Sequence, residues 1–272
     1  MKALLFACLL GCASAQTPDV RDIMSRVASN QAKTQDARQH FVYRQKQTVT
    51  IRRANGKVAR EERREYEITP AVRGAHRELL ARQGRYEQDG EYVLFTSGGG
   101  EAIGVITGAD SGMVEGFSEE MTQENSRDGI SNDQFPLTYH QQLKYDFRLA
   151  AVETYHGRRV YRVAFVPHER FGWKGEALID AEEYQPVFVT TKMAHGLPLA
   201  VKALLGTDVH GFGFSVSYQK FEDGVWFPVS YGGEFSVRAL FFYRRTVSIS
   251  MANSDFRRVD VTSNVSYSTK EP

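Results

Sequence analysis

Three short stretches of alternating apolar and polar residues, separated by residues that break regular structure, constrain the fold of this chain most strongly. They cover Val160–Pro167, Gly175–Asp180 and Tyr184–Met193. Alternation with a period of two is typical of strands that bury one face, and the breakers between the stretches indicate turns. The pattern therefore predicts an antiparallel meander.

Turn signals elsewhere extend this meander over most of the chain. Asn55-Gly56, Asp89-Gly90, His156-Gly157 and Asp223-Gly224 each stand next to an extended stretch, and such pairs favour tight hairpins. Repeated hairpins require antiparallel neighbours. We expect a mainly antiparallel β fold of the α+β class, built as one large curled sheet or unclosed half-barrel with an N-terminal helix and a short helical lid. Residues 16–272 are expected to form a single domain, since all-β domains of this length are commonly single.

The N-terminal helix is predicted from Thr17-Pro18-Asp19, which offers a capping hydroxyl, a proline in the first turn and an acid close behind. Apolar residues then recur from Val20 to Ala28 at helical spacing. An amphipathic helix of about four turns should lie with this stripe against the sheet.

Aromatic side chains gather on the predicted strands. Phe212, Phe214 and Tyr218 share one face of a strand. A curled sheet with two or three helices cannot cover both its faces, so these side chains either line a ligand cavity or fill a core, and the sequence leaves both open. The candidate cavity residues are Tyr43, Tyr92, Phe95, Phe147, Phe165, Phe212, Phe214, Trp226 and Phe241.

Two segments do not fit the meander. Residues 97–130 are rich in glycine and are predicted to form a flap with a short helix near Phe117–Gln123. Residues 197–205 are apolar nearly all round, so they form either an ordinary core helix or a lid over the apolar space. The candidate lid residues are Leu197, Leu199, Val201, Leu204 and Leu205.

The first residues resemble an export leader. Lys2 precedes an apolar run, and Ala13-Ser14-Ala15 offers a signal-peptidase site, which would make residues 1–15 a signal peptide. The competing interpretation is a lipoprotein leader of residues 1–11 that ends before Cys12, which would then carry lipid and anchor the chain to a membrane. Both cysteines, Cys8 and Cys12, lie in this segment, so thiol chemistry and disulfides are excluded from the mature chain apart from that lipidated residue.

Composition and motifs favour binding over catalysis. Lys and Arg number 34 against 33 for Asp and Glu, which argues against a nucleic-acid partner. The seven histidines show no metal-ligand spacing, and neither a nucleophile elbow nor a phosphate loop is present. We therefore predict no catalytic residues, no metal and no cofactor. The basic stretch Arg52–Arg64, interleaved with glutamates, is interpreted as a solvated hairpin with cross-strand ion pairs. The alternative is that it contacts anionic lipid headgroups or an acidic partner.

Two stretches resemble a known family. Gly175–Val189, in which a strand ends at Asp180 and another follows Tyr184-Gln185-Pro186, and Asp223–Ser230, a turn into an aromatic strand, are similar to the LolA-like superfamily of bacterial periplasmic lipoprotein carriers. The order of leader, helix, long hairpin and meander is similar too. The resemblance implies an unclosed barrel with a helical lid, whose apolar cavity receives acyl chains, and a periplasmic or outer-membrane-anchored protein that binds and transfers rather than catalyses. Its partner would be a lipid or an acylated protein. The alternatives are a cell-envelope regulatory or protein-interaction module that binds an envelope protein, and a hydrolase with no recognisable motif.

Overall fold

The computed structural model describes residues 18–71, 74–98, 109–121, 135–169, 172–194, 207–211, 213–221, 224–239 and 243–259. The helices are α1 (Val20–Arg38), α2 (Ala109–Met121) and α3 (Tyr139–Gln142). The strands are β1 (Phe41–Arg53), β2 (Val58–Pro70), β3 (Ala75–Gln88), β4 (Glu91–Gly98), β5 (Tyr145–Tyr155), β6 (Arg158–Pro167), β7 (Trp173–Asp180), β8 (Pro186–Met193), β9 (Thr207–His210), β10 (Gly213–Lys220), β11 (Trp226–Ala239) and β12 (Tyr243–Arg258).

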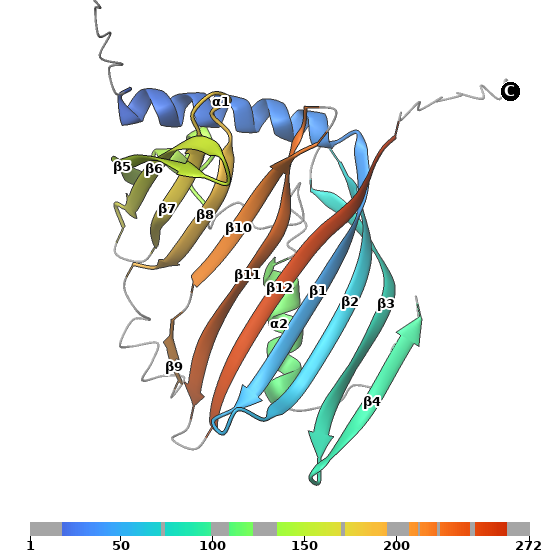
Figure 1. Cartoon of the computed structure of the whole chain (residues 1–272). Coiled ribbons are helices and arrows are strands. Elements are labelled where there is room, and N and C mark those ends of the chain that lie inside the picture. The colour runs from blue at the N-terminus through green and yellow to red at the C-terminus, as the bar shows by residue number, and fades with distance from the viewer. Residues whose placement is uncertain are drawn as a thin grey trace, which may run out of the picture.

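The strands form one open, antiparallel sheet (Figure 1). Their order is β4-β3-β2-β1-β12-β11-β10-β8-β7-β6-β5, and β9 pairs with β11 beyond the end of β10. β4 and β5 stand at the two ends of this order, so the sheet does not close into a barrel. This confirms the predicted unclosed half-barrel.

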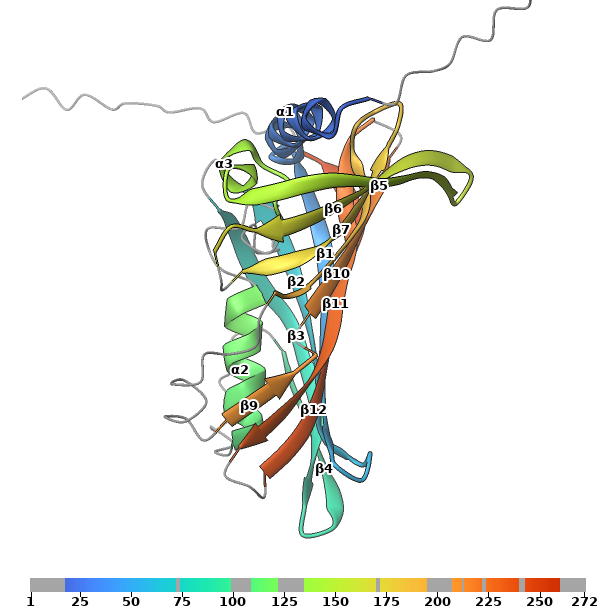
Figure 2. The same ribbon diagram turned by 90° about the vertical axis from the view of Figure 1, so that its left-hand side faces the viewer.

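The helices cover selected parts of the sheet. Figure 2 shows α2 and α3 on the concave side, while α1 runs across one end of the strands (Figures 1 and 2). The hairpin turns use the predicted residues: Asp89 and Gly90, and His156 and Gly157, all have positive φ. Two successive positive φ values belong to the turn type whose twist matches that of paired strands.

α1 begins two residues later than the sequence suggested. Asp19 is the N-cap, and its carboxylate accepts a hydrogen bond from the backbone amide of Arg21 at 3.0 Å. The predicted cap Thr17 lies outside the described residues. The buried stripe starts apolar with Ile23 and Val27 and ends polar, with Thr34 and Arg38 buried near the C-terminus.

The glycine-rich segment contains a longer helix than expected. α2 starts at Ala109, whereas the sequence placed a short helix near Phe117–Gln123. Val114 of α2 is 1% exposed and belongs to the main core, the large cluster that also contains residues of α1 and of nine strands. The predicted lid, residues 197–205, lies outside the described residues and stays a prediction.

Candidate binding face of the sheet

One row of paired residues crosses the concave face of ten neighbouring strands. Directly paired residues of antiparallel strands point to the same face, and Glu115 of α2 contacts Arg64 and Arg82 of the row, which identifies this face as the one beneath α2. The row, from β5 to β3, is Leu149, Val163, Ala177, Val189, Val216, Tyr231, Met251, Gln47, Arg64 and Arg82. Its character changes in order: seven apolar or aromatic residues, one amide and two cations.

The apolar half, from β5 to β12, carries a chain of aromatic rings beside the row. Phe214 stacks on Tyr231 with ring centroids 5.2 Å apart, and Trp173 lies 5.6 Å from Phe214. Phe165 contacts Tyr145 edge to face at 5.9 Å. Ring pairs of this geometry stabilise the face beyond their burial.

The charged half, on β1 to β3, contains a buried ion network. Glu62 is 1% exposed, and its carboxylate lies 2.9 Å from Arg60, 2.6 Å from Arg64 and 2.7 Å from Arg82. Burial by itself raises the pKa of Glu62, but the three guanidinium groups together hold this pKa below its usual value. Glu62 is therefore a fixed anion at the centre of the network.

Glu115 supplies a second, more accessible carboxylate. Its Oε1 accepts hydrogen bonds from Arg64 Nη2 at 2.7 Å and from Arg82 Nη2 at 2.9 Å. The Glu115 side chain is 43% exposed. α2 makes a further polar contact through Asp110, which accepts from Arg245 Nε at 2.9 Å and from the Tyr243 hydroxyl. Burial and the Asp110 carboxylate raise the pKa of Tyr243.

Gln47 stands between the two halves. It pairs with Met251 on the apolar side and with Arg64 on the charged side. The residue is 1% exposed, yet within the described part of the chain neither Oε1 nor Nε2 of its amide has a hydrogen-bond partner. A buried polar group without a partner costs about 1–3 kcal/mol of stability, so a partner for this amide would stabilise the protein.

The predicted cavity residues separate into several environments. Phe147, Phe165 and Phe214 lie together in or against the main core, on the apolar half. Tyr43 is buried in a different cluster with Phe227 and Phe256, at ring distances of 6.5 and 5.2 Å.

The remaining predicted residues lie apart from the apolar half. Phe95 is near the charged half, where Arg60 lies 5.2 Å from its ring. Trp226 belongs to a smaller cluster with Leu178. Tyr92 is 46% exposed, and because strand residues alternate it points to the face opposite Phe95. Phe212 and Phe241 lie outside the described residues.

The interpretation of Arg52–Arg64 as a solvated hairpin is wrong for one face of that hairpin. Arg60 and Glu62 are buried at 3% and 1% exposure, while Arg63, between Glu62 and Arg64, is exposed. The period of two sends alternate charges to opposite faces, and α2 covers the inner set. The sequence analysis did not select Gln47, Arg82 or Glu115. The one available signal was the alternation of Gln45, Gln47, Val49 and Ile51, which indicates that the two amides face inward.

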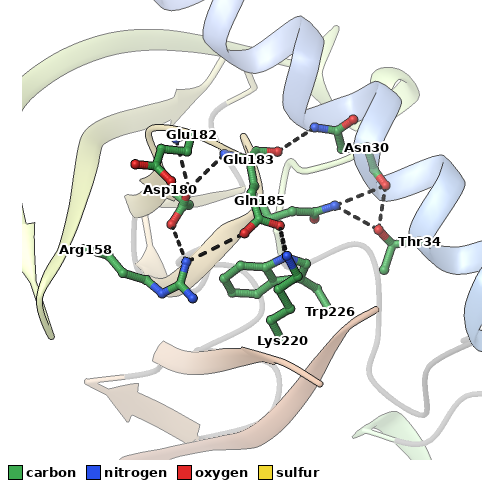
Figure 3. Close-up of polar contacts among 9 residues, drawn as sticks. All are labelled: Asn30, Thr34, Arg158, Asp180, Glu182, Glu183, Gln185, Lys220 and Trp226. Atoms are coloured by element: carbon green, nitrogen blue, oxygen red, sulfur yellow. Dashed lines mark hydrogen bonds and ion pairs between the residues drawn. The ribbon is translucent and has the colours of Figure 1, made fainter. Parts of the chain in front are cut away.

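A polar hub attaches α1 to the turn between β7 and β8 (Figure 3). Asp180 Oδ1 accepts hydrogen bonds from the backbone amides of Glu182 and Glu183 at 2.9 and 2.8 Å, and Arg158 Nη1 donates to Oδ2 at 3.0 Å. Asn30 of α1 donates to the backbone oxygen of Glu183 at 2.7 Å. These contacts set the turn and the helix in one position.

The side chain of Gln185 completes the hub from the same turn. Its Nε2 donates to Thr34 Oγ1 at 2.8 Å, and its Oε1 accepts from Gln31 Nε2 at 2.6 Å. On the other side of the turn, Glu183 Oε2 accepts from Trp226 Nε1 at 3.0 Å and lies 2.9 Å from Lys220 Nζ. The two stretches that carry the family resemblance therefore meet in this hub.

The described residues do not contain the elements of two other kinds of site. No group of three or more His and carboxylate side chains among them is placed to hold a metal ion. None of the described helices has the length and apolar character needed to cross a membrane.

Comparison with known proteins gives structural matches alone. No family model matches the chain, and no curated protein matches its sequence. Among solved structures, it is similar to a DUF1329 family protein from Desulfovibrio piger, with TM-score 0.42, 10% identity, and 89% of this chain and 94% of that chain covered.

Two further matches cover similar shares of the chain. An outer membrane lipoprotein-sorting protein domain from Vibrio parahaemolyticus gives TM-score 0.36 and 12% identity, with 86% of this chain and 93% of that chain covered. A LolA superfamily protein from Nitrosomonas europaea gives TM-score 0.38 and 8% identity, with 90% and 96% covered. The matches include the superfamily that the two stretches resemble, and the likeness concerns the fold.

Proposed function

We propose that this chain is a non-enzymatic binding or carrier protein of the bacterial cell envelope, which holds the acyl chains of a lipid or an acylated protein against the apolar half of its concave face. The observation that carries the proposal is the row from Leu149 to Met251, which is apolar or aromatic across seven neighbouring strands of an open sheet. The resemblance of Gly175–Val189 to lipoprotein carriers supports the same function.

Burial of acyl chains supplies enough free energy for such binding. Each methylene moved from water into an apolar site contributes about 0.8 kcal/mol, so ten methylenes contribute roughly 8 kcal/mol before the cost of ordering. No directed chemistry is required. We assign binding rather than catalysis because the described polar clusters are ion networks, and the His168–Asp146 pair, at 3.1 Å, is exposed to solvent, unlike a site that excludes water.

The leader supports an envelope location. Export with cleavage after Ala15 would leave Gln16 as the first residue, whereas lipidation would leave Cys12. Intact mass measurement of the protein purified from its host membranes and periplasm separates the two forms. A chain that keeps Met1 and stays in the cytoplasm would contradict this part of the proposal.

The two tryptophans of the chain provide a direct test of acyl binding. Trp173 packs against the main core beside Phe214, and Trp226 lies in the smaller cluster. A Trp226→Phe protein therefore reports the apolar half, and a Trp173→Phe protein is its matched control. Titration with diacylglycerol that carries brominated acyl chains should quench Trp173 strongly and Trp226 little. Absence of quenching in both proteins, or equal quenching in both, would show that acyl chains do not occupy this face.

A second function is favoured by one specific feature, the exposed end strand β4. Leu94 is 75% exposed and borders a surface groove of about 380 Å³, also lined by Arg85 and Thr96. An exposed strand edge with an apolar side chain can pair with a strand of a partner protein. The alternative is therefore an envelope interaction module, which a pull-down from envelope extracts tests by comparing the natural chain with Leu94→Lys.

A further inference from the structure

The row on the concave face joins an apolar surface to two cations in one direction. From Val189 on β8 to Arg64 on β2 there are five strand spacings, or about 24 Å along the sheet. Val216 and Met251 are 0% and 2% exposed, so an amphiphile laid along this row would displace the atoms that cover them. Its acyl chains would then contact Val216 and Met251, and its headgroup would lie near Gln47 and Arg64. The order of apolar and cationic residues along the row therefore suits a molecule that is apolar at one end and negatively charged at the other.

We propose that Gln47, Arg64 and Arg82 form a binding site for the phosphate-bearing headgroup of an amphiphile whose acyl chains lie on the apolar half. This inference rests on the proposed function and adds a headgroup class to it. Phosphate is the shared chemistry, whether it belongs to a lipid headgroup or to a free phosphate ester.

Glu115 marks the position of the anion. One of its oxygens contacts Arg64 Nη2 and Arg82 Nη2 together, at 2.7 and 2.9 Å, and two guanidinium groups that converge on one oxygen also suit a phosphoryl oxygen. Glu62 is 1% exposed and bound by three arginines, whereas Glu115 is 43% exposed and bound by two. A ligand can therefore replace Glu115 while Glu62 keeps the arginines in place.

Gln47 supplies the second, independent indication of a ligand. Its amide is buried beside Arg64 and has both a free donor and a free acceptor among the described residues. A phosphate monoester that retains one proton both accepts and donates hydrogen bonds, so it satisfies Nε2 and Oε1 at once. An ionised carboxylate only accepts, and would leave Oε1 without a partner.

The charge of this half of the face agrees with an anionic ligand. Among its described side chains, the arginines Arg60, Arg64, Arg77 and Arg82 outnumber the carboxylates Glu62 and Glu115. Burial lowers the pKa of Arg77 from its usual value, and the nearby positive charge of Arg64 acts in the same direction. An added phosphate would offset part of this positive charge.

The test uses the Trp226→Phe protein and two lipids with identical brominated chains, phosphatidic acid and diacylglycerol, with quenching of Trp173 as the readout. We expect phosphatidic acid to bind about tenfold more tightly, the equivalent of one charge-assisted contact. Gln47→Leu should weaken phosphatidic acid about tenfold and leave diacylglycerol unchanged. Glu115→Gln, which removes the competing carboxylate, should strengthen phosphatidic acid alone. Thr48→Val, on the neighbouring residue that points to the other face, is the matched control and should change neither.

Each other outcome overturns a defined part of the inference. Equal binding of the two lipids, or a Gln47→Leu protein with unchanged preference, overturns the headgroup site and leaves acyl binding standing. Failure of both lipids to quench Trp173 overturns acyl binding and the headgroup site together. Displacement of phosphatidic acid by glycerol 3-phosphate at equal concentration would identify a site for the free phosphate ester. This result would overturn the proposal that the ligand is an amphiphile.

Discussion

Gln47 of β1 is the direct cross-strand partner of Arg64 of β2, and in the described part of the structure its buried amide makes no hydrogen bond. The pairing places an unsatisfied donor and acceptor at the border between an apolar surface and an ion network. Such a group lowers the stability of the unliganded protein, and its position suits recognition better than packing.

Replacement of Gln47 by leucine should therefore stabilise the unliganded protein. Leucine has a similar size and removes the desolvated amide, so the free energy of unfolding should rise by about 1 kcal/mol. Urea denaturation followed by circular dichroism measures this change, with Thr48→Val as the reference variant. A loss of stability would show that the amide is satisfied in solution, for example by buried water.

Glu62 should be essential for folding stability because it neutralises three buried guanidinium groups. Glu62→Gln leaves these charges without their shared anion and should cost about 3–5 kcal/mol in the free energy of unfolding. Glu65→Gln, at a half-buried position of the same strand, is the matched control and should cost less than about 1 kcal/mol. If the two variants unfold alike, the network does not stabilise the sheet.

The low pKa of Glu62 also gives a direction for the pH dependence. A folded-state pKa below the usual value means that the contribution of Glu62 is complete above pH 4.5 and is lost as the pH falls through the folded pKa. The natural protein should lose stability in this acid range more steeply than Glu62→Gln. Thermal unfolding between pH 3 and pH 7 compares the two, and parallel curves would contradict the assignment.

α2 should be held to the sheet in large part by polar contacts that can be removed without unfolding the strands. Asp110→Asn weakens the contacts to Arg245 and Tyr243, and should speed amide hydrogen exchange in α2 about tenfold while β1 amides keep their protection. The same variant should bring the pKa of Tyr243 down toward its usual value, which ultraviolet titration follows. Unchanged exchange would mean that Val114 and its apolar contacts suffice to hold the helix.

The hub should fix α1 through Gln185. Gln185→Leu leaves Gln31 and Thr34 of α1 without their bonds to this amide, and should lower the free energy of unfolding by about 2 kcal/mol. Glu182→Gln, on an exposed side chain of the same turn, should stay within about 0.5 kcal/mol of the natural protein. If the two variants change the free energy of unfolding equally, the bonds of Gln185 do not stabilise the attachment of α1.

Local patterns predicted the elements of the sheet well, because alternation and turn residues act over a few positions. The hairpins at Asn55-Gly56 and His156-Gly157 and the meander from Val160 to Met193 are present as expected. The antiparallel pairing of the sheet followed from them, because a hairpin joins antiparallel neighbours.

The character of the charged half could not be predicted in the same way. Alternation shows that Arg60, Glu62 and Arg64 share a face, but it does not show what covers that face. This face is covered by α2, whose Glu115 is 51 residues from Arg64 in the chain. The segment that contains α2 is rich in glycine, so its sequence did not predict the whole helix. The cavity residues separated for a similar reason: Tyr43 and Trp226 are aromatic strand residues like Phe214, but they pack in clusters made by distant segments.

The pairing of β1 with β12 has a consequence for how the molecule is made. Gln45 and Asn253, bonded at 3.1 Å across this pair, are 208 residues apart in the sequence. Until β12 pairs with β1, strands β1–β4 are not hydrogen-bonded to the rest of the sheet. At that stage the apolar half has no arginine residues beside it. Such high contact order slows folding, so a newly synthesised chain would pass through a stage in which the apolar half is exposed and a chaperone or an early ligand could bind it.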